Sequence, residues 1–415
     1  MFRCMLGGLV SALALIGPVA AAPQGPPGAT ATELVALARQ LSPELAAAAL
    51  TAEAATARIL SAGALPDPTL RVDADNLDSR NVSMNGPTYT FRIMQEFPLW
   101  GKRELKSEMA SFEATAARYR YQSAQLDLVA RVKSVFAARY ATFRAQALTQ
   151  KARDTVLTAA ATLRDRYAQG GTTQEDVLRL EIEAEELQLE IERLRGQETK
   201  TAAQLNALLN RRPEAPLAIP VALRPLPVET KLNVALLVDR AVKLNPMIAE
   251  ADAKAGSANV AQSLAERNRY PDVSLGVLTT RDRAGYAGTG VMGEVRIPLQ
   301  WEAKNAEVSA ASAERAAAEQ KLSALRATLR GDIAGMLAAY RATAKTLDIL
   351  QQHHLSKSEQ VVQLALTALG AGQGDVLRVL DAIRRVRNVQ LEVLKVQVEQ
   401  QTSLAEIEKA IGGDL

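Results

Sequence analysis

The sequence carries the same set of motifs twice, and this duplication limits the possible folds more than any other feature. Four short motifs of the first half return in the second half, in the same order and about 200 residues later. The paired segments are 41–45 with 244–248, 66–70 with 271–275, 97–99 with 297–299, and 176–179 with 375–378. We therefore predict two structural repeats, at 32–210 and 232–412, separated by a proline-rich linker at 211–231 that cannot be helical throughout.

Each repeat shows the same predicted order of elements. A helix comes first, at 31–63 and at 234–269. A pair of strands follows, at about 69–98 and about 272–299, where apolar and polar residues alternate with a period of two. Such alternation indicates strands whose two faces meet different surroundings.

Long helical hairpins complete each repeat, at about 100–210 and about 301–412. Both segments lack proline, and both are interrupted by a glycine cluster where the chain is expected to turn back. The returning helices carry apolar residues at the alternating spacing of three and four that makes a coiled-coil seam. The seam residues are Val177, Leu180, Ala184, Leu187, Ile191 and Leu194 in the first repeat, and Val376, Val379, Ile383, Val386, Gln390 and Val393 in the second. We predict a mainly α fold with a small β part, in which each hairpin is an antiparallel coiled coil.

Residues 1–22 have the composition of a secretory signal peptide. Arg3 precedes an apolar stretch at 5–16, and alanines at 20–22 offer a cleavage site. The only cysteine, Cys4, lies inside this segment, so we expect a mature chain without thiol chemistry or disulfides. Beyond it no apolar run reaches the ~18 residues of a transmembrane helix, so a membrane role would have to use strands.

Composition and motifs argue against several classes of function. The formal net charge is +3, from 49 basic and 46 acidic residues, which does not favour a nucleic-acid partner. Residues 288–293 match G-x-G-x-x-G but lie before and within a predicted strand, which argues against a dinucleotide site. His353 and His354 are adjacent, so on a helix they point about 100° apart and cannot chelate a metal together. We expect no enzyme activity, no cofactor and no metal site.

Two strand pairs in one chain cannot close a membrane barrel, because their edges would face lipid with unpaired backbone groups. We therefore expect a homotrimer, in which four strands per chain build a 12-strand β-barrel above a helical tunnel. Charged strand residues should face the water-filled lumen, since an arginine facing lipid costs about 2–4 kcal/mol. They are Arg71, Asp73, Asp75, Arg92, Glu294 and Arg296. Trp100 and Trp301, where strands pass into helices, suit the aromatic belt of a membrane interface, with an ordinary core position as the alternative.

The duplicated order of helix, strand pair, long helix, glycine-containing tip and return helix resembles the TolC family of outer-membrane efflux proteins. Residues 374–377 and 410–413 carry the most specific similarity. Residues 95–103 resemble the branch that serves heavy-metal exporters of the resistance-nodulation-division type. The resemblance implies a passive exit duct in the outer membrane, docked through a periplasmic adaptor onto an inner-membrane pump of that type.

The resemblance also implies that the hairpin tips close the periplasmic end of the channel and meet the adaptor. Asp375 matches an aspartate that faces the channel axis in the family, but Arg378 stands where a family pattern has a second aspartate. This departure argues against an all-acidic constriction and favours ion pairs between copies, with ordinary helix-start residues as the alternative. The candidate gate residues are Asp375, Arg378 and Asp381 at the second tip and Asp176 and Arg179 at the first. The candidate adaptor contacts are Arg166, Tyr167, Gly170, Gly171, Gly370, Gly372 and Gly374, whose glycines also suit simple tight turns.

A second function stays open at the level of sequence. A soluble periplasmic coiled-coil adaptor or scaffold would also have long antiparallel hairpins. It would need no lipid-facing apolar face on its strand pairs, and it would usually carry one hairpin domain rather than two matched ones. The strand pairs therefore discriminate between a channel and an adaptor.

Overall fold

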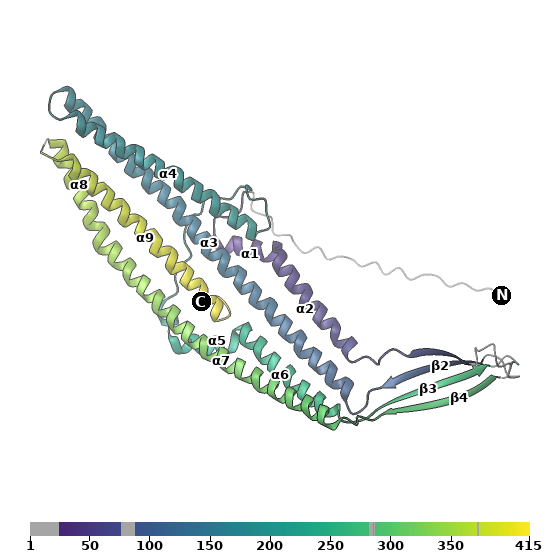
Figure 1. Cartoon of the computed structure of the whole chain (residues 1–415). Coiled ribbons are helices and arrows are strands. Elements are labelled where there is room, and N and C mark those ends of the chain that lie inside the picture. Colours follow the sequence, from purple (N-terminus) through teal and green to yellow (C-terminus); the bar gives the residue numbers. More distant parts are fainter. Residues whose placement is uncertain (1–24, 76–87, 282–284, 286, 372) are drawn as a thin grey trace, which may run out of the picture.

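The computed structural model describes residues 25–75, 88–281, 285, 287–371 and 373–415. The molecule is long and narrow, with a small sheet at one end and two helical hairpin tips at the other (Figure 1). The predicted mainly α fold with a small β part is confirmed. The predicted signal peptide at 1–22 and the tip residue Gly372 lie outside the described residues.

Each repeat contains short helices, two strands and a long helical hairpin (Figure 1). The first repeat consists of α1 (Ala31–Leu41), α2 (Pro43–Ala62), β1 (Thr69–Asp75), β2 (Thr88–Phe97), α3 (Lys102–Ala168) and α4 (Gln174–Leu208). The second consists of α5 (Val234–Leu244), α6 (Pro246–Arg267), β3 (Asp272–Arg281), β4 (Ala287–Arg296), α7 (Trp301–Ile349), a π-helical segment (Leu350–Leu355), α8 (Ser356–Ala371) and α9 (Val376–Ala410). A 3₁₀ turn, Glu229–Lys231, lies in the linker.

The prediction of a single helix at the start of each repeat was wrong, because each repeat begins with two helices. Ser42 separates α1 from α2, and Asn245 separates α5 from α6; both have an extended backbone. The cause is the proline that follows each of them, since a residue before proline is disfavoured in the helical conformation. The Ser42 hydroxyl then accepts the N–H of Leu45, and the Asn245 side chain accepts the N–H of Met247, so each break also caps the next helix.

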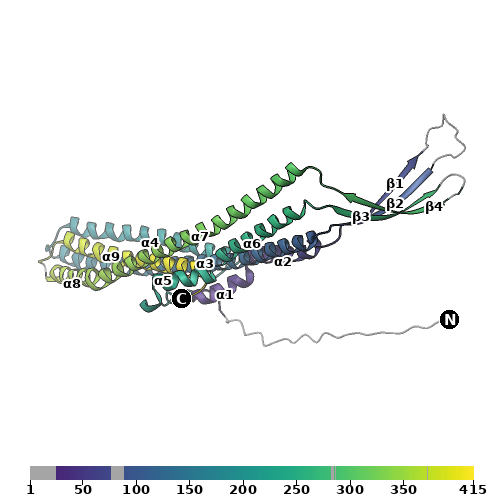
Figure 2. The same ribbon diagram turned by 90° about the horizontal axis from the view of Figure 1, so that it is seen from below.

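All four strands form one antiparallel sheet in the order β1-β2-β3-β4, so the two repeats meet between β2 and β3. The sheet is inclined to the helices (Figure 2). Because alternate residues of a strand point to opposite faces, the strand registers place the large apolar side chains on one face. They are Leu70, Val72, Tyr89, Phe91, Ile93, Leu275, Val277, Val291 and Val295, all exposed in the single chain. A contiguous apolar face of this kind requires something apolar to cover it.

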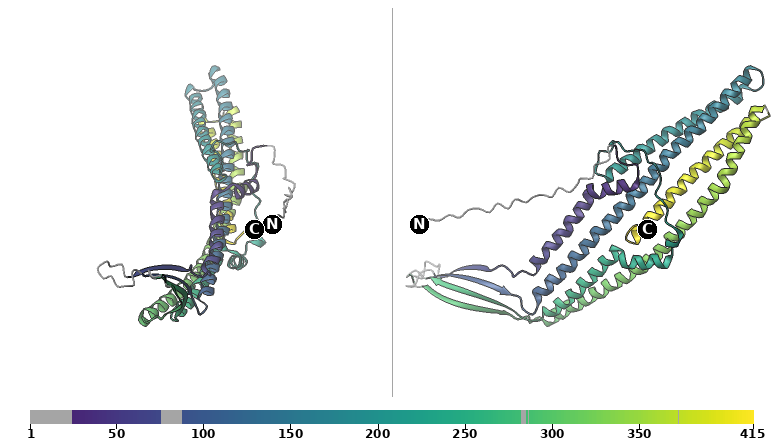
Figure 3. Two further views of the ribbon diagram at one scale, coloured as in Figure 1. Left: turned by 90° about the vertical axis from the view of Figure 1, so that its right-hand side faces the viewer. Right: turned by 180° about the vertical axis from the view of Figure 1, so that it is seen from behind.

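The central helix of the molecule is α3, which packs along α2, α4, α6 and α9. At the sheet end α2, α3, α6 and α7 lie side by side in one layer (Figures 1 and 3). Of the described helices, only α2 is long and apolar enough to cross a membrane by composition. Its Ala52 and Ala55 instead pack against Ala114 and Ala117 of α3, so this helix belongs to the layer.

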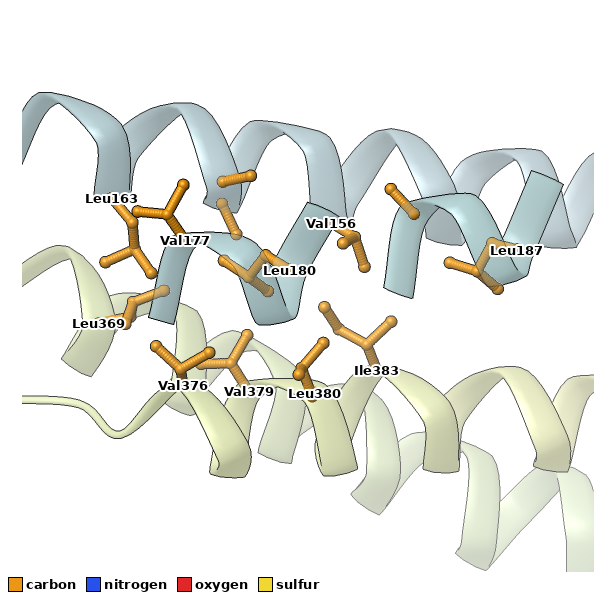
Figure 4. Packing of buried hydrophobic residues seen from close by; sticks show 13 residues of the cluster. Val156, Leu163, Val177, Leu180, Leu187, Leu369, Val376, Val379, Leu380 and Ile383 are labelled. Carbon is orange, nitrogen blue, oxygen red and sulfur yellow. The ribbon is translucent and has the colours of Figure 1, made fainter. Parts of the chain in front are cut away.

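The two hairpins share a hydrophobic core near their tips (Figure 4). Leu163 of α3 and Leu180 of α4 come from the first hairpin, and Leu369 of α8 and Val379 of α9 come from the second. The predicted seam residues are mostly buried, whereas Leu194, Val386 and Gln390 are only partly covered. The seam of each hairpin therefore also faces the other hairpin, which fixes the tips side by side.

Replacing Leu163, which is 2% exposed, with alanine should lower the free energy of unfolding by about 2–5 kcal/mol, because it leaves a cavity in this shared core. Leu157→Ala lies on the same helix but is 39% exposed, so it should cost less than about 1 kcal/mol. Urea denaturation of the detergent-solubilised protein, followed by far-ultraviolet circular dichroism, would compare the two variants. Equal losses would mean that this core does not hold the hairpins together.

Candidate functional site

The six charged strand residues predicted to line a lumen lie on the face of the sheet opposite the exposed apolar side chains: Arg71, Asp73, Asp75, Arg92, Glu294 and Arg296. Arg281, at the end of β3, lies on the apolar face. Asp73 lies between two arginines, 2.8 Å from Arg71 Nε and 2.7 Å from Arg92 Nη1. The sheet thus has one face suited to water and one suited to hydrocarbon, because ionised groups are costly in a lipid environment.

A compact junction joins the sheet to the helices where β2 passes into α3. Lys102 is buried, and its Nζ lies 2.8 Å from both carboxylate oxygens of Asp272 and 2.9 Å from the Tyr270 carbonyl oxygen. The Trp100 indole donates to the Pro271 carbonyl oxygen at 2.8 Å, and its ring lies 5.1 Å from that of Tyr270. The contacts of residues 100–102 therefore tie the first repeat to the start of β3 in the second. The sequence around Lys102 does not single it out, because its partner Asp272 lies 170 residues away.

The two tryptophans occupy similar places but differ in local structure. Trp100 precedes α3 in a left-handed conformation with φ 64°, whereas Trp301 is the first residue of α7. Both side chains are about half exposed at the junction between sheet and helices. Neither tryptophan is therefore a buried core residue of the single chain.

The hairpin tips touch one another at the far end of the molecule. Arg166 Nη2 donates to the Gly370 carbonyl oxygen at 2.6 Å, which links the first tip to the second. Gly170 has φ +75°, a conformation that favours glycine, and a Cβ at Gly374 would lie 2.5 Å from the Leu369 nitrogen. Gly170 and Gly374 therefore meet a steric demand, whereas a Cβ at Gly370 would meet open space. Tyr167 beside them is half exposed.

Among the residues that the structure describes, no hydrogen bond or ion pair joins the candidate gate residues of the second tip to one another. Asp375 is the N-cap of α9, because its Oδ1 accepts the backbone N–H of Leu377 at 3.0 Å. Asp381 lies 3.3 Å from Arg385 of the same helix. Arg378 is exposed and has no ion pair within the part of the chain that the structure describes. Within one chain Asp375 thus acts as a helix cap.

At the first tip the helix α4 is capped by a different residue, and Asp176 is not the cap. Thr173 is the N-cap of α4, and the Asp176 carboxylate accepts from the hydroxyls of Thr173 and Thr172 at 2.9 and 3.0 Å. Burial acts to raise the pKa of Asp176, but these hydrogen bonds outweigh it and hold that pKa below its ordinary value. Arg179 donates to Glu175 through its Nε at 3.0 Å, and this hydrogen bond raises the pKa of Arg179. The two tips are therefore not chemically equivalent.

An ion pair that the sequence did not predict joins the hairpins above the tips. Arg384 Nε of α9 donates to Glu183 Oε2 of α4 at 2.7 Å, and Glu183 is 3% exposed. This hydrogen bond raises the pKa of Arg384. The heptad spacing does not predict this pair, because it relates residues within one hairpin only. The only local signal is a glutamate adjacent to the seam residue Ala184.

A second buried network lies halfway along the molecule. Lys133 of α3 lies 2.7 Å from Glu408 of α9, and Arg224 of the linker lies 2.9 Å from the same carboxylate. Asp414 also contacts Lys133; burial acts to raise its pKa, but the Lys133 ammonium outweighs this and lowers it. The linker and the C-terminal segment are thus held against both repeats by buried charges.

No cluster of three or more His, Cys, Asp or Glu side chains that could hold a metal ion occurs among the described residues. His353 and His354 lie exposed in the π-helical segment. Residues 288–293, which match a nucleotide-binding pattern, lie within β4. The candidate site is therefore a two-faced sheet with a helical extension, and the described residues contain no recognisable reaction centre.

Comparison with known proteins agrees with this geometry. The sequence matches the family described as "Outer membrane efflux protein" over residues 34–211 and 237–413, which correspond to the two repeats. VceC of Vibrio cholerae has a similar fold, with TM-score 0.78, 19% identity, and 92% of this chain and 96% of that chain covered. MtrE of Neisseria gonorrhoeae (TM-score 0.75, 18% identity, 93% and 89% covered) and CmeC of Campylobacter jejuni (TM-score 0.77, 15% identity, 92% and 85% covered) also match. Comparison with curated protein sequences gives no significant match.

The family match covers most of the chain and both repeats. The matched structures include outer-membrane channels of the same duplicated architecture. The two-faced sheet and the long helical hairpins fit a protein whose strands lie in a membrane and whose helices extend into the periplasm. The chain belongs to the outer membrane efflux protein family, the TolC family, and is an efflux channel of the bacterial outer membrane.

Proposed function

We propose that three copies of this chain form the exit duct of a tripartite efflux system. The observation that carries the proposal is the sheet, which has one exposed apolar face, one charged face, and free edges at β1 and β4. A single four-stranded sheet would leave those edge N–H and C=O groups unpaired in lipid, at several kcal/mol each. Three copies supply 3 × 4 = 12 strands, so β4 of one copy can pair with β1 of the next and close a barrel.

The same sheet argues against the adaptor or scaffold function that the sequence left open. In a soluble protein the nine exposed apolar side chains would all face water. In a barrel they face lipid, and the Arg71, Asp73 and Arg92 cluster faces the aqueous lumen. The duct is passive in this proposal, and an inner-membrane pump of the resistance-nodulation-division type supplies the energy.

The periplasmic adaptor is proposed to dock on the hairpin tips. The turns from α3 to α4 and from α8 to α9 lie at the end of the molecule farthest from the sheet (Figure 1), where a partner from the inner membrane would arrive. The proposed gate is a ring in which Asp375 of one copy meets Arg378 of the next. The free guanidinium of Arg378 supports this assignment, because it has no ion pair among the described residues.

The proposed cargo is heavy-metal cations, on the resemblance of residues 95–103. The described residues offer no tight metal site, so the ions would pass without being held. Deleting the gene from its host should increase sensitivity to transition-metal salts while leaving tolerance of organic drugs unchanged. Growth inhibition assays over both classes would measure this, and an equal loss of drug tolerance would remove metals as the specific cargo.

The trimer is tested by the mass of the detergent-solubilised outer-membrane protein, with the detergent subtracted. The expected mass is three protomers, and a stable monomer in the membrane fraction would overturn the proposed duct. Val277→Arg puts a charge on the apolar face, at a cost of about 2–4 kcal/mol, so it should prevent membrane assembly. Leu278→Arg, one residue on and on the opposite face, should assemble normally.

The gate is tested by single-channel conductance in planar bilayers. Asp375→Ala with Arg378→Ala should raise conductance, because both partners of the proposed ring are removed. Asp375→Asn with Arg378→Ala is the matched control, because asparagine caps a helix as well as aspartate but carries no charge. Raised conductance in both variants supports a charged ring. An increase in the first variant alone would show that Asp375 serves only as a cap.

A further inference from the structure

Two methionines flank a glycine in one row of the charged face of the sheet. Strand pairing places Met94 of β2 opposite Gly276 of β3, and Gly276 opposite Met292 of β4. Residues that stand opposite one another on neighbouring strands point to the same face. Both methionines therefore lie on the face that carries Arg92 and Glu294, each two residues away along the same strand.

Gly276 leaves room for the side chain of Met94 above β3. A Cβ at Gly276 would lie 2.9 Å from Met94 Cγ and 2.5 Å from the Ile93 carbonyl oxygen, closer than real Cβ atoms come. A glycine inside a strand weakens the strand, and it often marks a place where a ligand or another backbone approaches closely. Here Met94 Cγ occupies the space above the glycine, on the side from which Met292 is reached.

The two thioether sulfurs can reach one point above Gly276. Cβ atoms of opposite residues on neighbouring strands are about 4.5–5.5 Å apart, so the Met292 Cβ lies about that far from the Cβ position of Gly276. Met94 Cγ already lies next to that position, at 2.9 Å. Methionine is unbranched and has three rotatable bonds, so each sulfur can turn toward the other without a shift of the strands.

Met94 and Met292 are unusual residues for a face that meets water. The charged face of the described strands carries only three large apolar side chains, namely Leu278 and these two methionines. The other large apolar side chains of the described strands lie on the opposite face. Both methionines are partly exposed, so an ion from solution can reach them. Unlike leucine, methionine offers such an ion a donor atom.

An acidic row adjoins the methionines on the side of the helices. Glu96 follows Met94 by two residues and Glu294 follows Met292 by two, so all four side chains share one face. Glu96 lies 3.4 Å from an arginine of β4, whereas Glu294 has no ion pair among the described residues. The two arginines in the row on the other side share the Asp73 carboxylate. A cation that arrives from the helical part therefore meets carboxylates before it meets the sulfurs.

We propose that Met94 and Met292 form a binding site for soft monovalent cations, Cu(I) or Ag(I), on the inner wall of the duct. Thioether sulfur is a soft ligand that suits such ions, whereas carboxylate and carbonyl oxygens suit magnesium and calcium. The proposal rests on the proposed duct and narrows its cargo to soft ions. In the trimer three such pairs lie at one level of the lumen, because each copy contributes the same row.

The methionine pair is a weak site, which agrees with the lack of a His, Cys, Asp and Glu cluster among the described residues. Two neutral sulfurs supply fewer donors than a closed metal centre, and water completes the coordination. The carboxylate of Glu294 attracts the cation but lies in the next row. A conducting path needs sites that an ion both enters and leaves, so a weak site suits an exit duct.

Nuclear magnetic resonance of the methionine methyl groups tests the site in the detergent-solubilised full chain with Cys4→Ser, which removes the only thiol. Silver nitrate is the probe. The Met94 and Met292 signals should shift together, at a lower silver concentration than the signals of the other methionines, because two sulfurs share one ion. Magnesium nitrate should shift neither signal, since oxygen ligands suit magnesium. An equal response to magnesium would place the ion on the carboxylates and overturn the thioether site.

Single substitutions test whether the two sulfurs act as a pair. Met94→Leu conserves side-chain volume and removes one sulfur, so the Met292 signal should lose its shift at low silver concentration. Met292→Leu should do the same to the Met94 signal. Met109→Leu on α3 is the matched control and should leave both shifts unchanged. If the Met292 signal of Met94→Leu shifts as readily as before, the sulfurs bind separately and the shared site is refuted.

The mass of the same protein separates this inference from the proposed duct. Three copies by mass without the paired shift would overturn the methionine site and leave the duct standing. A paired shift in a protein that is a monomer by mass would refute the duct, and with it the place of the site on a channel wall. The sensitivity of the gene-deletion host should rise more for silver salts than for cobalt salts. An equal rise for both would overturn the narrowing to soft ions and leave a metal duct in place.

Discussion

The packing of α3 against α9 is the interaction on which the rest of the structure depends. It places the outgoing helix of the first repeat against the return helix of the second along much of the molecule. Each hairpin buries its own seam, and the core near the tips joins those seams into one cluster that contains Leu163, Leu180 and Val379. The two repeats also meet along α3 and α6 and in the sheet, so the contact with α9 is what joins them in the part of the molecule nearer the tips.

Three ion pairs, each with at least one buried partner, fix the register of one repeat against the other. Lys102 pairs with Asp272 at the sheet junction, Lys133 with Glu408 halfway along, and Glu183 with Arg384 near the tips. Each pair joins one residue of the first repeat to one of the second. Buried ion pairs add little net stability, but removing one partner leaves a buried charge unpaired. They therefore disfavour any shift of one repeat along the other.

The functional surfaces follow from what this body leaves uncovered. The sheet exposes an apolar face that a membrane can cover and a charged face that suits water. Near the tips the helices also expose apolar side chains, among them Ile182 of α4 and Leu364 of α8. The single chain thus leaves uncovered an apolar sheet face, a charged sheet face and two strand edges.

Local pattern in the sequence determined the duplication, the strand pairs, the hairpins and the seam faces, because period and spacing report which side of an element is buried. Pro43 and Pro246 also account for the helix breaks at Ser42 and Asn245, which the expected single helices did not include. Only the tertiary structure decided that α3 meets α9 and that Lys102, Lys133 and Glu183 have partners in the other repeat. Spacing along a helix says that one side is covered but not by what, and the partners of these ion pairs lie 170–275 residues away in sequence.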